Sequence, residues 1–570
     1  MRVLTAAGLA VVLLAAPSPA RAQTRGGTTP DAGGGSGVTV GLDPRIPVVG
    51  LPVAAVVRFS TLRPQTVTVF YRTVGTAPYV SLAAQPTGEP GVFRVSIPTA
   101  VPLSGIDAFA EYVVDGETRT EPTSSPALRP YRVPAFIPIA RPDAPLPARQ
   151  YRMVTVPLFL ASQVPAGTTI DGIGSDEPDD VFGDDFGRGA DPARWRLLRF
   201  DPAQNRSVDY AAARAAFGPV RPGEAYWLIT ATGGPFDVEA GVSTGVAFEG
   251  SQPFATALTV ELAPGWNQIG SPFLFPVAWD DVDKPASVED PVAFRGAYEP
   301  AQAVLEPWVG YFVFNTGGRT RLTFDALPGS GPSSQALRPA DRLLTRTGGV
   351  VLDVRAEVGA SADHVFLGIA AAGAGLELHK PPAIDDGLRL IVRDGERALA
   401  AAIRGATGTP RWDLDVGGVT GAFTLVFDAH REAGPAPAVT VEDLDRGGIL
   451  PVVGGRAVVP AAGVPVRQLR VRLGAPEATH AAALGRPYPS PTRGAVAVPF
   501  LLPAPGPARV AVVDVLGRVV RIVHEGLLPG SGEVRWDGLD DAGRRVAPGL
   551  YVVRIEAASA SAAVPVTVLP

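Results

Sequence analysis

Short apolar runs separated by turn residues recur along most of the chain. Between residues 38 and 135, four runs of β-branched and aromatic residues alternate with Pro, Gly or Asp-Gly breaks. Runs of this length and spacing predict short strands of an immunoglobulin-like or fibronectin-III-like sandwich. The runs are Val53–Phe59, Thr66–Tyr71, Phe93–Ile97 and Phe109–Val114.

The same pattern returns in the second half of the chain. Residues 340–475 again alternate short apolar runs with breaks such as Pro381-Pro382, which predicts a second β-sandwich. Strand-like runs also fill residues 488–570. Between these parts, we expect residues 136–150 to be a Pro-rich spacer and residues 476–487 to be a linker. The predicted fold class is therefore all-β, with several sandwich domains in tandem.

A central, internally repeated β-rich domain is predicted over residues 151–328. Three segments recur in the same order, which points to two similar units packed together or to one pseudo-symmetric domain. Aromatic residues at matching positions are interpreted as shared core, the alternative being a sugar-binding face. The matched segments are Val154–Leu158 with Ile269–Phe273, Phe200–Gln204 with Tyr298–Gln302, and Pro222–Ile229 with Pro307–Phe314.

The N-terminus has the features of a secretory signal peptide over residues 1–22. Arg2 precedes the apolar stretch from Leu4 to Ala16, and Ala20-Arg21-Ala22 forms a small-residue cleavage site before Gln23. The apolar stretch is shorter than the ~20 residues that a membrane-spanning helix needs. Residues 23–37 are rich in Gly and Thr and are expected to form a flexible linker.

The amino-acid composition argues against some classes of partner and excludes some classes of site. The formal net charge of −6 argues against nucleic acid as a partner, because phosphate binding requires a basic face. The absence of cysteine excludes disulfides, thiolate metal sites and cysteine nucleophiles. Lysine occurs only at Lys284 and Lys380, and we interpret the excess of arginine as genome composition rather than as a binding device.

The last 83 residues carry a specific set of motifs. Turn glycines follow or precede apolar runs, and Trp536 is a plausible plug between two sheets. In order and spacing, these motifs resemble the C-terminal sorting domain of the bacterial type IX secretion system. They equally resemble the immunoglobulin-like domain of flagellar hook-capping proteins. The residues that carry the resemblance are Tyr488, Pro489, Pro491, Asp514, Gly517, Trp536, Asp537, Gly538, Gly543, Gly549 and Tyr551.

The resemblance implies a route and a location. It implies export by the Sec translocon, then passage through the outer membrane by the type IX secretion machinery. The protein would then be retained at the cell surface or released. A hook-capping role is disfavoured, because that protein is not made with a cleaved Sec leader. Motifs in the central domain, such as Trp195–Leu198, are similar to domains of large secreted proteins with such tails, which supports the context without indicating an activity.

An acidic segment between residues 171 and 191 is the candidate metal site. Its carboxylates are crowded among glycines, and Ca²⁺ takes six to eight oxygen ligands from loops of this kind. The spacing of an EF-hand loop is absent, so a solvated turn cluster remains the alternative. The candidate ligands are Asp176, Asp179, Asp180, Asp184 and Asp185. No other cofactor is expected.

The sequence contains no recognisable catalytic pattern. Gly241–Gly245 matches the G-x-S-x-G motif of hydrolases around Ser243, but the following residues predict a strand where the motif requires a helix. None of the five histidines lies within seven residues of another. We therefore expect a non-enzymatic exported protein with a structural or adhesive role. The alternatives are an extracellular glycan- or polymer-binding protein and, less favoured, a secreted hydrolase with an unrecognised site.

Overall fold

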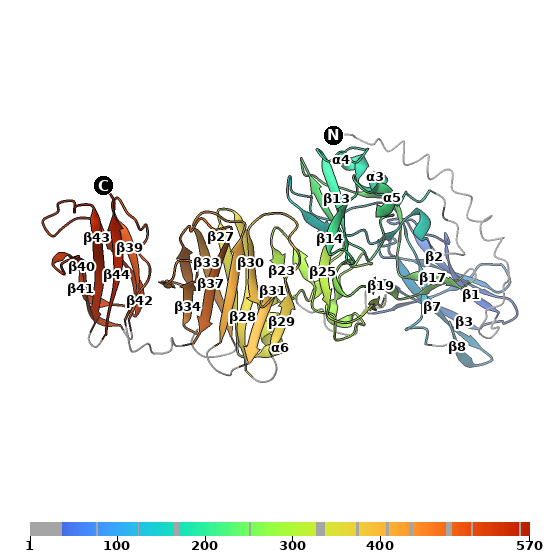
Figure 1. The fold of residues 1–570 in the computed structure, drawn as a ribbon. Coiled ribbons are helices and arrows are strands. Elements are labelled where there is room, and N and C mark those ends of the chain that lie inside the picture. The colour runs from blue at the N-terminus through green and yellow to red at the C-terminus, as the bar shows by residue number, and fades with distance from the viewer. Residues whose placement is uncertain are drawn as a thin grey trace. The chain divides into compact units, whose positions relative to one another are not determined.

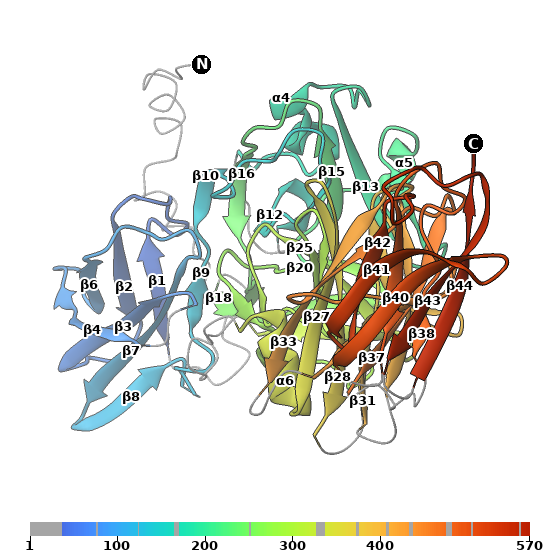
Figure 2. The same cartoon turned by 90° about the vertical axis from the view of Figure 1, so that its left-hand side faces the viewer.

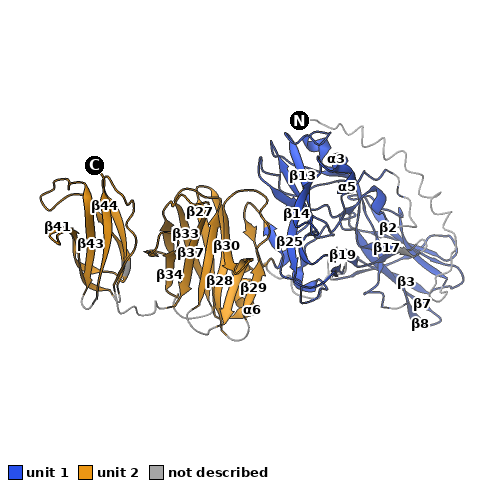
Figure 3. Cartoon of the chain, viewed as in Figure 1, with its two compact units in different colours: residues 1–293, 303–335 blue, residues 294–302, 336–570 orange. Residues whose placement is uncertain are grey.

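The chain divides into two units. Unit 1 comprises Met1–Ala293 and Ala303–Gln335, and unit 2 comprises Phe294–Gln302 and Ala336–Pro570 (Figure 3). Both consist almost entirely of β-sheet, which confirms the predicted all-β fold class (Figure 1). The computed structural model describes residues 37–75, 78–123, 125–164, 170, 172–249, 252–325, 337–371, 375–405, 410–431, 437–474, 482–502, 505–557 and 560–570. The predicted leader, the linker up to residue 36 and residues 475–481 lie outside this part of the chain.

Unit 1 begins with the predicted sandwich. Alternating apolar residues bury one face of each strand, as in β1, where Val38, Val40 and Leu42 point into the core. One sheet has the order β1-β2-β6-β5, and the second contains β9-β7-β3-β4 with β8 paired to β7. The strands are β1 (Val38–Asp43), β2 (Val53–Phe59), β3 (Thr66–Thr73), β4 (Val80–Ala83), β5 (Gln85–Pro86), β6 (Val92–Ile97), β7 (Ile106–Val114), β8 (Glu117–Glu121) and β9 (Tyr131–Val133).

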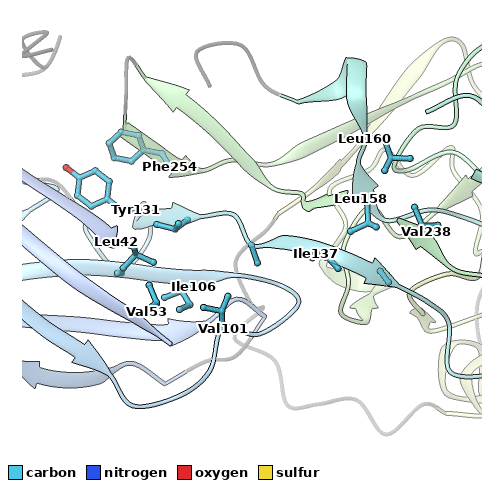
Figure 4. Packing of buried hydrophobic residues seen from close by; sticks show 14 of the residues in the cluster. Leu42, Val53, Val101, Ile106, Tyr131, Ile137, Leu158, Leu160, Val238 and Phe254 are labelled. Carbon is cyan, nitrogen blue, oxygen red and sulfur yellow. The ribbon is translucent and has the colours of Figure 1, made fainter. Parts of the chain in front are cut away.

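The first sandwich shares its core with the central domain. The hairpin of β17 (Val246–Glu249) and β18 (Gln252–Ala255) comes from the central part of the sequence, yet β18 pairs with β9 and extends the sheet of the sandwich (Figure 2). Tyr131 and Phe254 contact each other at this junction, while Ile137 and Leu158 continue the same hydrophobic cluster into the central domain (Figure 4). Segments distant in sequence therefore build one continuous core.

The segment predicted as a spacer takes part in this core. Residues 136–150 begin with β10 (Phe136–Ala140), which pairs with β16 (Val238–Ser243). The strand forms despite Pro138 because β10 is an edge strand in the order β10-β16-β12, where a missing N–H is tolerated.

A buried ion pair connects three elements of unit 1. The guanidinium of Arg132 on β9 donates to both oxygens of Asp107 on β7, with distances of 2.7 and 3.0 Å. Arg72 donates to the same carboxylate at 3.2 Å, and Arg132 also donates to the carbonyl of Gly245, just before β17. Both Arg132 and Asp107 are almost fully buried. Removing one partner would leave an uncompensated buried charge, so the pair links the inserted hairpin to the sandwich.

The predicted internal repeat is visible as the same strand order in both copies. The first copy contains the order β11-β15-β13 and the second contains β20-β25-β22. In each copy a buried tyrosine, Tyr226 or Tyr311, accepts the backbone N–H of the residue five positions earlier. The first copy has β11 (Arg152–Val154), β12 (Leu158–Phe159), β13 (Trp195–Asp201), β14 (Arg206–Asp209) and β15 (Tyr226–Thr230), with short helices η1 (Ala161–Gln163), α3 (Pro178–Val181), α4 (Gly183–Phe186) and α5 (Arg214–Phe217). The second copy has β19 (Leu258–Leu262), β20 (Gly265–Gly270), β21 (Val277–Ala278), η2 (Trp279–Asp281), β22 (Val292–Phe294), β24 (Val304–Leu305), β25 (Gly310–Asn315) and β26 (Thr320–Phe324).

The two copies meet across a local pseudo-two-fold axis. The N–H of Thr155 donates to the carbonyl of Trp308 at 3.1 Å, and the N–H of Gly270 donates to the carbonyl of Gly223 at 3.0 Å. In the repeat alignment, Thr155 corresponds to Gly270 and Gly223 corresponds to Trp308, so the two hydrogen bonds are equivalent. Gly223 and Trp308 also share positive φ angles of 86° and 67°. The two copies are therefore joined by equivalent backbone hydrogen bonds.

The first domain of unit 2 is one large curved sheet. Its strands follow the order β35-β34-β37-β32-β30-β31-β28-β27-β33-β36, with β29 paired to β31, and the end strands β35 and β36 approach each other. Trp412 lies fully buried in the enclosed core, and helix α6 covers the outside of β27, β28 and β33. The elements are α6 (Pro339–Thr347), β27 (Val350–Val358), β28 (Ser361–Ala370), β29 (Leu376–His379), β30 (Arg389–Asp394), β31 (Arg397–Gly405), β32 (Arg411–Gly417), β33 (Phe423–Arg431), β34 (Val439–Asp443), β35 (Ile449–Leu450), β36 (Arg456–Val459) and β37 (Val466–Leu473), and unit 2 also includes β23 (Tyr298–Glu299).

The C-terminal module is a sandwich of two sheets. The orders are β38-β39-β42 and β41-β40-β43-β44, and the two inner faces enclose a separate hydrophobic cluster around Trp536, Val510 and Ile555 (Figure 1). The strands are β38 (Ala483–Leu484), β39 (Val496–Leu501), β40 (Gly506–Asp514), β41 (Val519–Leu528), β42 (Ser531–Trp536), β43 (Gly549–Ala557) and β44 (Ala560–Val568).

Candidate functional sites

The motif residues of the C-terminal module fall at structural positions. Trp536 is 2% exposed, and its ring lies 5.4 Å from that of Tyr551 in the core between the sheets. The indole N–H of Trp536 donates to the carbonyl of Leu539, and the hydroxyl of Tyr551 donates to the carbonyl of Ala547. Both aromatic residues therefore fix the loop between β42 and β43 as well as the core.

Two turns of the module are built in the same way. In the first, the carboxylate of Asp514 accepts the N–H groups of Leu516 and Arg518 at 2.9 and 3.0 Å. In the second, Asp540 accepts those of Ala542 and Arg544 at 3.0 and 2.8 Å. The third residue after each aspartate is a glycine in the left-handed region, Gly517 at 78° and Gly543 at 72°. We call these loops the paired turns.

The segment around Tyr488, which follows β38, is tied to β39 and β42. Tyr488 and Ala497 exchange two backbone hydrogen bonds of 2.9 Å each, and the Tyr488 hydroxyl donates to the carboxylate of Glu533. Burial and this carboxylate raise the pKa of Tyr488 well above its usual value. Asp537 accepts the N–H of Leu539 at 3.0 Å. These motif residues thus form turns and core contacts of the sandwich.

Three of the five candidate calcium ligands are held by protein groups. The buried carboxylate of Asp176 accepts the N–H and hydroxyl of Ser162 and the amide of Gln163. Asp179 accepts the N–H groups of Gly189 and Ala190, and Asp180 forms an ion pair with Arg188 at 2.5 Å. These three aspartates stabilise the loop around α3 and α4.

The other two candidates meet a third carboxylate. Oxygens of Asp184, Asp185 and Asp237 all lie within 4.8 Å of one another, and we call this group the carboxylate triplet. The Asp237 N–H donates to Asp185 at 2.9 Å. Loss of hydration raises the pKa of Asp185 to about 6, and the charges of Asp184, Asp237 and Glu239 add to that rise. Carboxylate oxygens at this spacing are the donor type that Ca²⁺ prefers. Sequence reasoning missed Asp237 because it lies more than 50 residues downstream.

A groove of about 980 Å³ with a mixed polar and apolar lining opens in unit 1 where the two copies of the repeat meet. One wall is formed by β13, β14 and α5 of the first copy, and the other by β19 and β20 of the second; Figure 1 labels all of these except β20, which is labelled in Figure 2. Arg199, Arg206 and Arg221 line it. Its volume is within the ~300–1,000 Å³ range of ligand sites. Because we interpreted the excess of arginine as genome composition, the sequence did not lead us to predict this groove.

The aromatic residues of the repeat lie mainly in the core. Tyr226, Trp227, Trp266 and Tyr311 are at most 9% exposed, and Trp308 is partly buried against the same cluster. The core interpretation is therefore confirmed for these four residues.

Ser243, at the centre of the hydrolase-like motif, is also buried. Its hydroxyl accepts the N–H of Ala135 at 2.9 Å, and the strand β17 follows it, as the sequence predicts. Two histidines contact carboxylates: His364 lies 3.2 Å from Asp353, and His430 lies 3.0 Å from Asp341. Across the described residues, no helix has the length and apolar character needed to cross a membrane.

No protein-family model and no curated protein matches the chain. Among solved structures, latent PorU from Porphyromonas gingivalis is 8% identical, covering 94% of this chain and 34% of PorU, with a TM-score of 0.14. The chain thus spans about a third of PorU's length. The tetra-tandem repeat of a large adhesion protein is 12% identical, covering 93% of this chain and 98% of the repeat structure, with a TM-score of 0.14. PorZ, a surface component of the P. gingivalis type-IX secretion system, is 11% identical, covering 94% of this chain and 82% of PorZ, with a TM-score of 0.14. At these TM-scores the likeness carries no argument about function.

Proposed function

We propose that this chain is an exported, non-catalytic protein of the cell surface or the surrounding medium, with a structural or adhesive role and a C-terminal sorting module. The observation that carries the proposal is the C-terminal module itself. It is a complete sandwich with its own core, and the residues behind the resemblance build its turns and interior. The signal peptide expected from the sequence supplies the first export step.

The rest of the chain is consistent with a scaffold. Unit 1 has a continuous core through two domains, and unit 2 has a large closed core with a separate terminal sandwich. The one serine in a catalytic-type motif is buried and hydrogen-bonded to the backbone. These features support a structural role over hydrolysis.

A transfer experiment tests the sorting role. A reporter carrying the signal peptide at its N-terminus and residues 482–570 at its C-terminus is expressed in a host with a type IX secretion system. We expect the reporter to reach the surface or the medium. The full chain without residues 488–570 should stop in the periplasm, because its Sec signal remains. Fractionation and protease accessibility report the location.

Two variants test whether sorting requires the folded module. Trp536→Ala removes a core side chain, at a cost of about 3–5 kcal/mol for a buried aromatic, and should abolish transfer. Leu527→Ala alters a side chain that is 77% exposed and should leave transfer unchanged. Normal surface amounts of the truncated chain would show that the module is only another sandwich.

A further inference from the structure

Three arginine side chains line the groove without a carboxylate partner in the described part of the chain. Within the described residues, Arg199, Arg206 and Arg221 form no ion pair with a carboxylate. Neighbouring Arg196, on the same strand as Arg199, pairs with Asp209 at 2.6 Å. Carboxylates are therefore available locally, and the groove arginines are left with free donors.

Contacts within the protein orient two of the three guanidinium groups, those of Arg199 and Arg206. Arg199 donates to the carbonyl of Ala216 at 3.2 Å and lies over the ring of Phe217. Arg206 donates to the side chain of Gln204 at 2.6 Å. A guanidinium has five N–H donors, so these contacts leave several directed outward for a bidentate acceptor.

The acidic residues of the groove are mostly engaged within the protein. Asp201 accepts the N–H groups of Ala203 and Gln204, and Glu224 accepts the hydroxyl of Tyr226 at 3.0 Å. With Glu261 at the rim, three carboxylates balance the three arginines. The groove therefore has little net charge. Its arginines keep free N–H donors, whereas the carboxylates of Asp201 and Glu224 already accept hydrogen bonds within the protein. A densely anionic polymer would be repelled by the same carboxylates.

The apolar lining decides between a peptide and a sugar. Pro202, Val208, Pro222 and Val260 line the walls, whereas the aromatic rings there, Phe159 and Phe200, are partly or fully buried. Sugars stack on exposed aromatic faces, while small aliphatic surfaces suit aliphatic peptide side chains. The edge strand β14 also provides a free backbone edge beside the groove, of the kind to which an extended peptide adds.

We infer that this groove binds an extended peptide segment in which single acidic residues alternate with small apolar ones. The carboxylates of the peptide would occupy the free donors of the three arginines, and its apolar side chains would contact the proline and valine walls. This inference goes beyond the proposed sorting and structural role and does not depend on the C-terminal module.

Fluorescence anisotropy with the purified full chain tests the inference. The probe is a fluorescein-labelled 12-residue peptide of three Glu-Val-Ser-Val repeats, and the comparison ligands are its Lys-Val-Ser-Val counterpart and a polygalacturonate oligomer. We expect saturable binding of the Glu peptide only. Because hydrogen bonds to charged groups are strong, Arg206→Gln and Arg221→Gln should each weaken binding about tenfold.

The variants are chosen so that folding does not obscure the result. Arg206 and Arg221 are exposed, and Arg141→Gln, at an exposed position of unit 1 outside the groove, is the matched control with unchanged binding expected. Unfolding temperatures of all three variants should equal that of the parent chain. Preferential binding of polygalacturonate, no saturable binding of the Glu peptide up to about 1 mM, or equal loss in the Arg141→Gln control would each overturn the inference.

Discussion

Exchanging two residues across the pseudo-two-fold axis tests the architecture of the central domain. Thr155 and Gly270 are equivalent positions of the repeat and face each other. A Cβ atom added to Gly270 would lie 2.3 Å from the Cβ of Thr155, more than about 1 Å inside ordinary van der Waals contact. Gly270→Thr alone should therefore destabilise the domain by about 3 kcal/mol, the upper range for overpacking.

The reverse single change is also unfavourable. Thr155→Gly removes the hydrogen bond of 2.6 Å from the threonine hydroxyl to the carbonyl of Glu224, worth about 1 kcal/mol. Thr155 directly follows β11, and the greater backbone freedom of glycine in the unfolded chain adds a cost of about 0.4–1 kcal/mol. In the double variant the threonine simply changes copies, so its hydroxyl can reach the equivalent carbonyl of Val309. We expect the double variant to lose only about 1 kcal/mol, which is far from the sum of the singles.

Calorimetry of the full chain and hydrogen exchange of peptides covering β11 and β20 provide the measurements. The calorimetric transition of the central domain should fall in both single variants and return in the double variant. Exchange at β11 and β20 should follow the same order. If the stability loss of the double variant equals the sum of the losses of the single variants, the reasoning is refuted. That result would mean that the side chains at the two positions do not compete for the same space.

Three further results are expected. Asp514→Ala and Asp540→Ala should each lower the Tm of the C-terminal module by a similar amount, because each removes equivalent hydrogen bonds of the paired turns; unequal Tm shifts would contradict this equivalence. The raised pKa of Asp185 means that the folded state holds its proton more tightly than the unfolded state, so its stabilising contribution is complete below about pH 4 and lost as pH rises through about 6. Between pH 4 and 7, the free energy of unfolding should depend less on pH in Asp185→Asn than in the parent chain. The difference should be no more than about 1 kcal/mol, because the residue remains open to solvent. At pH 7, calorimetry should detect weak Ca²⁺ binding that Asp185→Asn abolishes and Asp180→Asn retains. If no heat is detected at millimolar Ca²⁺, the segment is a solvated turn cluster and not a calcium site.

Much of the fold could be predicted because its signals are local. Alternating apolar runs predict strands, and the ordered matches around Tyr226 and Tyr311 predict the repeat, whose tyrosines make the same backbone contact. Glycines such as Gly517 indicate turns because positive φ angles disfavour other residues. The insertion of β17 and β18 into the first sandwich was missed, since hairpin residues carry no mark of the distant strand with which they pair.

The candidate sites depended on distant contacts and were predicted only in part. The sequence identified Asp184 and Asp185 but could not distinguish them from Asp176, which nearby backbone and side-chain donors occupy. Asp237 joins them only through the fold. The groove arginines are spread over two strands and a loop, so no motif connects them. What unites them, a place in the lining of one groove, exists only in three dimensions.

The shared core of unit 1 has a mechanical consequence. The first sandwich and the central domain are joined by three chain crossings, at β9–β10, β16–β17 and β18–β19, and by the buried pair of Arg132 and Asp107. A pulling force applied to this unit is divided among these connections, so no single hinge can yield alone. In a force-extension measurement unit 1 should therefore give one rupture event, whereas the terminal sandwich of unit 2, with its own core, should give a separate one.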